Sequence, residues 1–279
     1  MEPHMTPARP AARLHPGKCL LHAAAWIAIT YMMVPLAVII ATSFNESNRL
    51  AFPPQGFSLK WYTAFLSDPT YIDSILNSTQ LALGATVIAL VLGTAAALAM
   101  ARGQFPGRSA LLTLLMSPLV LPNIVIGAAL LQFASMLGFA RTFTSLLAGH
   151  VILVLPYVVR LVLSSFSGLN RSLEEASQDL GASPFSTFFR ITLPQIKPGI
   201  VSGGLFAFVV SWVNVELSIF NTSPQLSLLP VKILNYVEYT VDPLIAAVSA
   251  STIYVAIVMV LLIDAFIGID KFANARAES

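Results

Sequence analysis

The sequence predicts an all-α integral membrane protein with six transmembrane helices. Hydrophobic residues make up 56% of the 279 residues and charged residues only 10%, whereas a soluble globular domain carries about 25% charged residues. Apolar runs of the roughly 20 residues that a helix needs to cross the hydrocarbon core recur along the chain. The net charge of +2 is too small to indicate a nucleic-acid partner.

Six segments meet this length and hydrophobicity: 22–43, 75–101, 109–136, 143–167, 197–220 and 244–268. We therefore expect a six-span domain over residues 22–268, between an N-terminal tail at 1–21 and a C-terminal tail at 269–279. A basic stretch before the first apolar run is also found in signal peptides. This run is long enough to cross the membrane and no small-residue cleavage site follows it, so we expect a span that is retained.

Lysine and arginine are shared unevenly between the two sides of this topology. One side, formed by the tails, the turn after the second span and the loop before the fifth, carries Arg9, Arg13, Lys18, Arg102, Arg108, Arg171, Arg190, Lys197, Lys271 and Arg276. The other side carries Arg49, Lys60, Arg141 and Lys232. Because cytoplasmic loops are enriched in basic residues, both termini and the loop before the fifth span are expected to be cytoplasmic.

That loop, residues 171–194, is far more polar than its surroundings and predicts two short helices. Ser172 and Glu175 have the S-x-x-E spacing of a capping box, so the first helix is expected to begin directly after Ser172. Gly181 is placed to end this helix in a left-handed conformation. The pattern therefore predicts a helix–turn–helix between the fourth and fifth spans.

The second short helix is predicted to begin at Ser183 as N-cap, with Pro184 at the first helical position. Its spacing brings three aromatic side chains onto one face: Phe185, Phe188 and Phe189. The pair Leu193-Pro194 is expected to stop this helix before the next span. An exposed aromatic patch marks a partner site more often than an ordinary solvated loop, so we expect the segment to dock a partner.

This segment resembles a known motif. The run EAS at 175–177, Gly181, and the run ITLP at 191–194 are similar to the EAA motif of permease subunits of binding-protein-dependent ABC importers, with serine in place of the motif's third residue. In that family the motif forms a coupling helix that seats in a groove of the cytoplasmic ATPase. Residues 171–194 are therefore called the coupling segment. The resemblance assigns ATPase coupling to Glu174, Glu175, Ala176, Ser177, Gly181, Ala182, Phe185, Phe188, Phe189, Leu193 and Pro194.

Further stretches are similar to the spermidine/putrescine-type branch of these permeases: FPPQGFSLKWY at 52–62, RSLEEASQDLGAS at 171–183, LPVKI at 229–233, DPLIAAVSA at 242–250 and IGIDKF near the C-terminal end. The resemblance implies a type I ABC importer permease in the bacterial inner membrane, carrying a polyamine or similar small organic cation. It also implies three partners: a second, distinct permease, a cytoplasmic ATPase dimer, and a periplasmic or extracellular substrate-binding protein.

The ATP chemistry is expected on the partner ATPase. The chain contains no G-x-x-x-x-G-K-[ST] phosphate loop, so we expect a permease without a cofactor of its own, with ATP and Mg²⁺ bound by the partner. No cluster of His, Cys and carboxylates has metal-ligand spacing and no nucleophile–base pair stands out, so neither a metal site nor a catalytic residue is expected. His150 in the fourth span is interpreted as a hydrogen-bonded histidine rather than a proton relay.

The fifth span carries the polar residues most relevant to transport. On a regular helix Ser211, Asn214, Ser218 and Asn221 fall on one stripe, with Glu216 roughly opposite, at about 100° per residue. Polar groups in lipid usually face a pathway or bond to a neighbouring helix, and the pattern leaves both readings open. The candidate pathway residues are Ser211, Trp212, Asn214, Glu216, Ser218 and Asn221.

Val213 departs from the pattern of the polyamine-type branch. Many of those permeases read S-F-D where this chain reads Ser211-Trp212-Val213, so an acid able to attract a cation is replaced. Glu216, toward the external end, is kept as a candidate cation contact. Two alternatives stay open: the same machinery carrying another small solute, or an ion-coupled secondary transporter, which should show membrane-embedded acids or paired inverted repeats.

Overall fold

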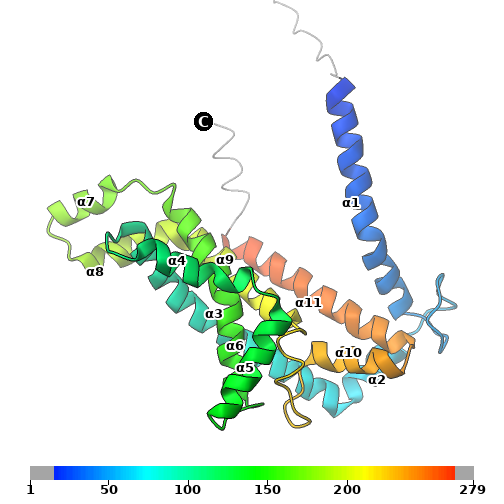
Figure 1. The fold of residues 1–279 in the computed structure, drawn as a ribbon. Coiled ribbons are helices and arrows are strands. Elements are labelled where there is room, and N and C mark those ends of the chain that lie inside the picture. Colours follow the sequence, from blue (N-terminus) through cyan, green and yellow to red (C-terminus); the bar gives the residue numbers. More distant parts are fainter. Residues whose placement is uncertain (1–15, 268–279) are drawn as a thin grey trace, which may run out of the picture.

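The computed structural model describes residues 16–267, and the regular elements in this range are all helices (Figure 1). They are α1 (Pro16–Ser43), α2 (Lys60–Ser67), α3 (Pro69–Arg102), α4 (Arg108–Met116), η1 (Ser117–Leu119), α5 (Asn123–Met136), α6 (Phe143–Phe166), α7 (Ser172–Asp179), α8 (Pro184–Thr187), η2 (Phe188–Thr192), α9 (Leu193–Val213), α10 (Leu229–Tyr239) and α11 (Pro243–Ile267). The predicted all-α fold class is confirmed.

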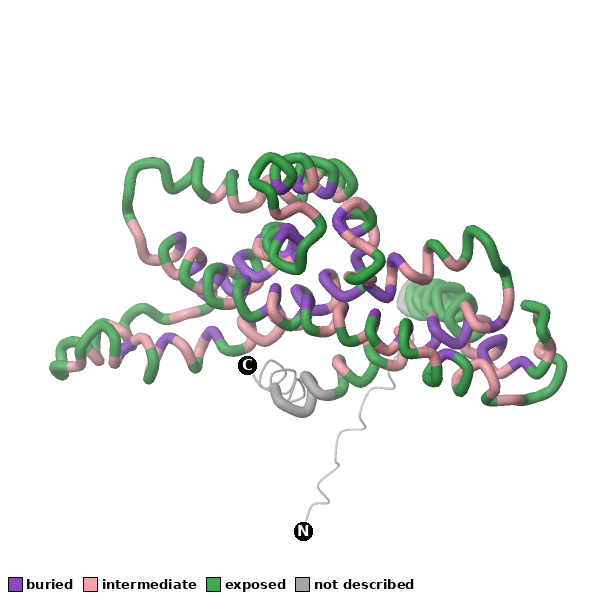
Figure 2. Tube along the Cα trace, turned by 90° about the horizontal axis from the view of Figure 1, so that it is seen from below, coloured by how far each residue is buried: buried purple, intermediate pink, exposed green. Residues whose placement is uncertain are grey.

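Three long helices, α3, α6 and α9, pack against one another and form the core. Alanine and glycine occupy many of the contact positions, which lets the backbones approach closely, as is common between membrane helices. At Gly93 of α3, an added Cβ would stand 2.7 Å from Cγ1 of Val158 in α6. Buried positions gather where the helices face one another, and exposed positions lie on the outer surfaces (Figure 2).

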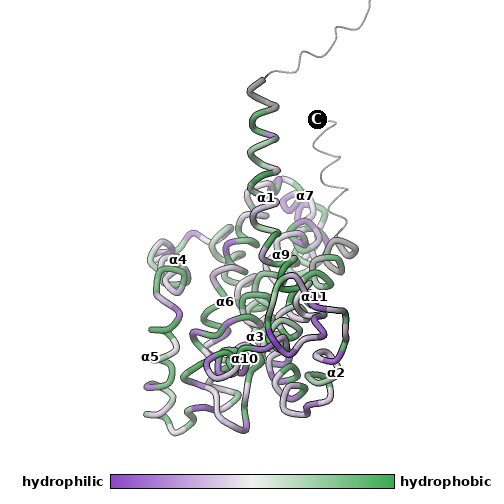
Figure 3. Tube along the Cα trace, turned by 90° about the vertical axis from the view of Figure 1, so that its right-hand side faces the viewer, coloured by the Kyte–Doolittle hydropathy of each residue, from purple (hydrophilic) through white to green (hydrophobic). Residues whose placement is uncertain are grey.

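The helix α1 extends away from this core and packs against α11 (Figure 1). Its side chains from Leu20 to Leu36 are exposed although most are apolar. Apolar residues colour most of α1 and α11, and hydrophilic residues gather in the loops and at helix ends (Figure 3). An exposed apolar helix of this length fits a lipid environment, where the hydrocarbon core takes the place of a protein partner.

The third expected span, 109–136, is not one straight helix. The stretch Arg108–Leu119 and the helix Asn123–Met136 meet at an angle of 103°. Pro118 and Pro122 lie at this bend; proline has no backbone N–H and its ring obstructs the preceding turn. The prediction of a single span here is therefore corrected to a bent pair of helices.

The fifth span differs from its predicted bounds of 197–220 at both ends. A continuous helical stretch runs from Pro184 to Val213, so Leu193-Pro194 does not stop the helix. The turn Phe188–Thr192 is π-helical, and the Leu193 N–H bonds to the Phe188 carbonyl five residues back. Pro194, which has no backbone N–H to donate, lies just after this wider turn.

The other spans lie close to their predicted ranges. The helices α1, α3 and α6 and the stretch Pro184–Val213 are each long and apolar enough to cross a membrane, and α11 occupies the sixth expected range. The helix α1 begins at Pro16, inside the predicted tail 1–21. Residues 1–15 and the whole predicted tail 269–279 lie outside the described residues.

Candidate functional site

Candidate functional residues lie at both ends of the helix bundle: the coupling segment at one end, and polar residues near α2 and α10 at the other. The helices α7 and α8 of the coupling segment project at one end, and α2 and α10 lie at the other (Figure 1). The helix α3 joins the two ends: Arg102 at its C-terminus contacts Glu174, and Asn77 near its N-terminus donates a hydrogen bond to the Ser227 carbonyl at 3.2 Å. With 34 residues, α3 is about 50 Å long at 1.5 Å per residue.

The start of the coupling segment corrects one sequence prediction. The helix α7 begins at Ser172, and the expected capping box between Ser172 and Glu175 does not form. Instead Oδ1 of Asn170 accepts hydrogen bonds from the Ser172 N–H at 3.1 Å and the Ser172 hydroxyl at 2.8 Å. Asparagine competes well for such local backbone bonds. Glu175 is left to pair with Arg171 at 3.2 Å on the exposed surface.

The end of α7 follows the prediction. Gly181 has φ +88°, in the left-handed region that favours glycine. Its N–H bonds to the Gln178 carbonyl at 2.8 Å, and the Ala182 N–H bonds to the Ser177 carbonyl at 3.1 Å. This pair of bonds is the Schellman motif, which satisfies the last carbonyls of a helix. The turn between α7 and α8 is therefore fixed by backbone hydrogen bonds.

The second helix also begins where predicted. The Ser183 hydroxyl accepts a hydrogen bond from the Ser186 N–H at 3.2 Å, and Pro184 occupies the first helical turn. Phe185, Phe188 and Phe189 share a surface, with ring centroids 4.6 Å apart for the pair 185/189 and 5.1 Å for the pair 188/189. Phe185 is 74% and Phe189 49% exposed. These three rings, the Phe knob, form an apolar projection on the coupling segment.

The two adjacent glutamates of the coupling segment face different ways. Glu174 is 13% exposed, whereas the Glu175 side chain is 62% exposed. Oε1 of Glu174 accepts hydrogen bonds from Nη2 of Arg102 at 3.0 Å and from the Thr192 hydroxyl at 2.7 Å, and Oε2 lies 3.0 Å from Nε of Arg102. The Arg102 guanidinium also stacks over the Phe166 ring at 5.5 Å.

These contacts form a link between elements that are distant in sequence, and we call the three residues the Arg102–Glu174–Thr192 cross-tie. It fastens the start of α7 to the end of α3 and to the π-helical turn below α9. From the sequence, Arg102 is informative only about topology, and Thr192 is not a predicted site residue. Neither carries a local signal for this role, because only the packing of three separate elements brings them together.

The polar stripe predicted for the fifth span does not lie on one helix. The helix α9 ends at Val213, and Asn214 takes an extended conformation with ψ 120°. The five candidates other than Glu216 are nevertheless buried: Ser211, Trp212, Asn214, Ser218 and Asn221. Each donates or accepts a hydrogen bond within the chain; Trp212 Nε1, for example, lies 3.2 Å from the Thr79 hydroxyl.

Two of the residues discussed from the sequence in this region, Glu216 and Val213, are exposed. They flank the break in the fifth span, on the side of the bundle away from the coupling segment. Among the residues singled out from the sequence here, these two are therefore the ones open to a solute or a second subunit. Sequence periodicity placed Glu216 correctly away from the stripe, although the helix on which that argument relied ends before it.

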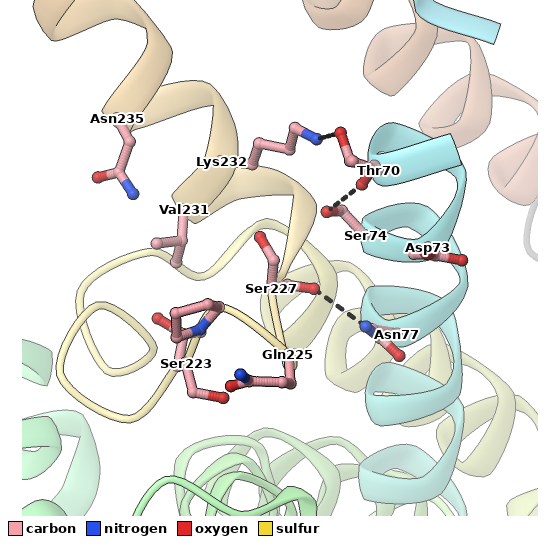
Figure 4. Close-up of a pocket in the computed structure, with 12 residues that line it drawn as sticks. Thr70, Asp73, Ser74, Asn77, Ser223, Gln225, Ser227, Val231, Lys232 and Asn235 are labelled. Carbon is pink, nitrogen blue, oxygen red and sulfur yellow. Dashed lines mark hydrogen bonds between the residues drawn. The ribbon is translucent and has the colours of Figure 1, made fainter. Parts of the chain in front are cut away.

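A polar cavity of about 600 Å³ lies beside this break and was not predicted from the sequence (Figure 4). It opens between the first turns of α3, the loop 222–227 and α10, and its polar lining residues are Thr70, Asp73, Ser74, Asn77, Thr222, Ser223, Gln225, Ser227, Lys232 and Asn235. Lys232 donates to the Thr70 hydroxyl and lies 4.0 Å from the Tyr71 ring centroid. We call this site the outer cavity.

Electrostatics at the rim of the outer cavity follow from local burial and hydrogen bonding. Desolvation lowers the pKa of Lys232 below its ordinary value, although Asp68 and Asp73 act in the opposite direction. Hydrogen bonds from the Thr70 hydroxyl and N–H to the Asp68 carboxylate hold its pKa below the ordinary value. Within residues 16–267 no group of three or more His, Cys, Asp and Glu side chains is arranged to hold a metal ion.

Residues 89–272 match the model of one protein family, described as the binding-protein-dependent transport system inner membrane component. The chain belongs to this family. It is thus a permease component of a transport system in the inner membrane. The all-α fold and the several apolar helices are consistent with this membership.

Two curated relatives are similar to this permease over most of its length. It is 32% identical over 231 residues to the spermidine/putrescine transport system permease protein PotC of Escherichia coli (strain K12), covering 83% of this chain and 87% of PotC. It is 33% identical over 230 residues to the putrescine transport system permease protein PotI of the same strain, covering 80% and 82% of the two chains. Both relatives are permease proteins of polyamine transport systems.

A solved structure supports the fold of the permease. A chain of a bacterial ABC transporter involved in the import of the acidic polysaccharide alginate superposes with a TM-score of 0.71 at 14% identity, covering 92% of this chain and all of that chain. At this identity the likeness concerns the fold alone. It shows that the described helices are arranged as in that transporter chain.

Proposed function

We propose that this permease forms half of the translocation pathway of an ATP-driven importer and that its coupling segment docks on a cytoplasmic ATPase. The observation that carries this proposal is the exposed Phe knob on a segment fixed to the bundle by the Schellman turn and the cross-tie. An exposed aromatic cluster at the end of a rigid element fits a groove on a partner protein. ATP and Mg²⁺ would be bound by that partner.

Movement of the ATPase would be transmitted to the pathway by one long helical stretch, which acts as a rigid lever. The helical stretch Pro184–Val213 is 30 residues long, about 45 Å at 1.5 Å per residue. Its first turn carries Phe185, and it ends next to the break at Asn214 and the exposed Glu216. Closure of an ATPase dimer at the knob would therefore tilt the whole fifth span and open or close the pathway at its far end.

The two ends of the helix bundle offer surfaces for different partners of this permease. With the coupling segment on the ATPase side, the termini of the six-span topology would lie in the cytoplasm and the outer cavity on the opposite side. There the family's substrate-binding protein would deliver the solute, and a second permease, distinct from this one, would complete the pathway. The exposed apolar faces of α4 and α5 leave surface for such a subunit and for lipid.

We infer that the substrate is a polyamine or a similar small organic cation. The identities of 32% to PotC and 33% to PotI support this class. Val213 stands where the polyamine-type pattern has an acid, and the exposed Glu216 is the carboxylate nearest to it along the described chain. Glu216 would therefore take over the attraction of the cation. The alginate importer shows that the same fold carries other solutes, which is the alternative.

The proposal is tested by uptake of labelled spermidine and putrescine into proteoliposomes that contain the permease, its partner permease, the ATPase and the binding protein. We expect uptake that requires both ATP and the binding protein. Uptake of another solute but neither polyamine would overturn the substrate class and leave the importer intact. Uptake by this chain alone, without ATPase or ATP, would contradict the importer itself.

Replacing Glu216 with glutamine should raise the KM for polyamine uptake by about tenfold, which corresponds to 1.4 kcal/mol of lost attraction for the cation. The maximal rate should change little, because the variant keeps the shape of the side chain. The matched control is Glu238→Gln, an exposed glutamate on α10 at the same end of the bundle. Equal effects of the two substitutions would show that only the general surface charge matters.

A further inference from the structure

A buried histidine has both ring nitrogens engaged from two sides of the break in the fifth span. Nδ1 of His150 lies 2.7 Å from the Ser211 hydroxyl, in the last turn of α9. Nε2 lies 3.0 Å from the Ser218 hydroxyl, in the turn that follows the break. His150 itself has no exposed surface. One side chain of α6 thus bridges the helix and the irregular segment beyond it.

The hydrogen-bond partners of Ser218 determine which nitrogen of His150 carries the proton. The Ser218 hydroxyl also lies 3.0 Å from the Asn214 carbonyl, and a carbonyl only accepts hydrogen bonds. Ser218 therefore donates its single proton there and accepts from Nε2–H of His150. In the neutral imidazole, Nδ1 is then an acceptor, so the Ser211 hydroxyl donates to it. The four groups form one directed chain, Ser211 to His150 to Ser218 to Asn214, which we call the His150 chain.

A second side-chain hydrogen bond stabilises the break at Asn214. Oδ1 of Asn214 accepts a hydrogen bond from the Leu217 N–H at 3.0 Å, as an N-cap does for the turn that follows. Buried backbone groups without partners are costly in a membrane protein. The Asn214 side chain satisfies the Leu217 N–H and the Ser218 hydroxyl satisfies the Asn214 carbonyl, so backbone groups of the irregular turn, residues 214–222, keep partners within the bundle. His150 contributes indirectly, because its contact with Ser218 orients that hydroxyl.

Close packing against two glycines also holds this turn in place. An added Cβ at Gly127 of α5 would stand 2.8 Å from the Leu217 Cα, and one at Gly149 of α6 would stand 2.3 Å from Cδ2 of Leu130 and 3.1 Å from Cδ2 of Leu217. Nδ2 of Asn221 donates to the Gly127 carbonyl at 2.9 Å. The turn 214–222 is thus held against α5 and α6 by close packing as well as by hydrogen bonds.

We propose that His150 is a positioning residue that fixes the turn 214–222 and, through it, the exposed Glu216 and the loop wall of the outer cavity. The turn contains Glu216 and leads directly into Thr222 and Ser223, which line that cavity. In this role His150 stays neutral, with its proton on Nε2, and exchanges no proton with a solute. The functional consequence rests on the proposed importer function, whereas the tautomer and the rigidity of the turn do not.

The tautomer is tested directly by nitrogen-15 NMR of the histidine-labelled permease complex. The chain has four histidines, so the signal of His150 is assigned by its disappearance in His150→Gln. We expect a neutral ring protonated on Nε2. A proton on Nδ1, or a charged ring at neutral pH, would overturn the His150 chain.

The rigidity of the turn is tested by thiol labelling of Glu216→Cys in a Cys19→Ser background, with and without His150→Leu. Leucine fills a similar space but makes neither hydrogen bond, so we expect a labelling rate about tenfold higher, the factor expected from about 1.4 kcal/mol of lost hydrogen bonding. Glutamine offers a donor and an acceptor, so His150→Gln should label at an intermediate rate. The control is Val159→Ala, a buried position of the same helix that belongs neither to the His150 chain nor to the core cluster that contains Leu217.

In the transporting complex the same variants should separate binding from turnover. His150→Leu is expected to raise the KM for uptake about tenfold while the maximal rate stays within about twofold, because Glu216 is displaced but the lever is intact. Val159→Ala should lower thermal stability without this change in KM. Unchanged labelling and unchanged KM in a folded His150→Leu complex would refute the positioning role. If uptake fails in the parent complex, the labelling and NMR results still decide it.

Discussion

In a complex carrying Arg102→Glu, ATP hydrolysis is expected to continue while ATP-driven uptake falls by at least about tenfold. The substitution places a second carboxylate against Glu174, whose side chain is only 13% exposed. Breaking a buried ion pair by removing one partner costs about 3–5 kcal/mol. We expect the lower end of this range, since Arg102 keeps 24% of its surface exposed. Losing the Arg102–Glu174 ion pair would detach the start of α7 from α3, although the hydrogen bond from the Thr192 hydroxyl to Glu174 does not depend on Arg102.

The expected uncoupling follows from where the cross-tie lies. Glu175 and the Phe knob face outward and remain available to the ATPase, so the complex should still assemble. The force that reaches the coupling segment, however, would no longer pass to α3 through Glu174. Hydrolysis and uptake measured on the same proteoliposomes give the ratio of ATP consumed to solute carried, and this ratio should rise.

Two variants make this result specific. The charge-swapped pair Arg102→Glu with Glu174→Arg keeps one positive and one negative group in contact and should recover part of the uptake. Arg108→Glu reverses an exposed charge at the same end of the bundle and should leave the ratio unchanged. Normal coupling in Arg102→Glu, or no recovery in the swapped pair despite normal assembly, would show that the cross-tie transmits nothing.

Replacing Gly181 with valine or proline is expected to abolish coupled uptake. Gly181 has φ +88°, and a left-handed conformation costs a residue with a Cβ about 1–2 kcal/mol, more for a β-branched one. Proline fixes φ near −65° and also removes the N–H that bonds to the Gln178 carbonyl. The turn between α7 and α8 would therefore change direction, and the Phe knob would be displaced relative to α7.

The control for Gly181 is another glycine with the same backbone strain. Gly107 has φ +84° and, like Gly181, has no atom within 4 Å of an added Cβ, but it lies before α4 and outside the coupling segment. Gly107→Val should cost similar stability without changing the ratio of hydrolysis to uptake. Coupled uptake by a folded Gly181→Pro complex would contradict the role of this turn.

Local signals in the sequence predicted local structure well. The left-handed glycine at 181, the N-cap at Ser183 and the shared face of the Phe knob each depend on neighbours within a few residues. The structure confirms all three. The capping box at Ser172 was wrong for a local reason too: Asn170, two residues earlier, offers a better acceptor for the same N–H.

Features that depend on distant residues could not be read from periodicity. The sequence around Asn214 contains neither glycine nor proline, so periodicity alone predicts a helix that continues past Val213. The break is set by His150 and by the socket for Leu217, which come from α6 and α5. The outer cavity is assembled from α3, a loop and α10, and the different directions of Glu174 and Glu175 depend on Arg102. In each case the deciding partner lies more than 50 residues away along the chain.

Docking of the coupling segment on the ATPase can be tested by site-specific photocross-linking. A photoreactive phenylalanine analogue at Phe185 in the intact complex should cross-link to the ATPase subunit on illumination. The same analogue at Tyr239, 87% exposed at the opposite end of the bundle, should not. Cross-linking of the ATPase from Tyr239 would contradict docking through the coupling segment. So would the absence of cross-linking from both positions in a complex that hydrolyses ATP and transports.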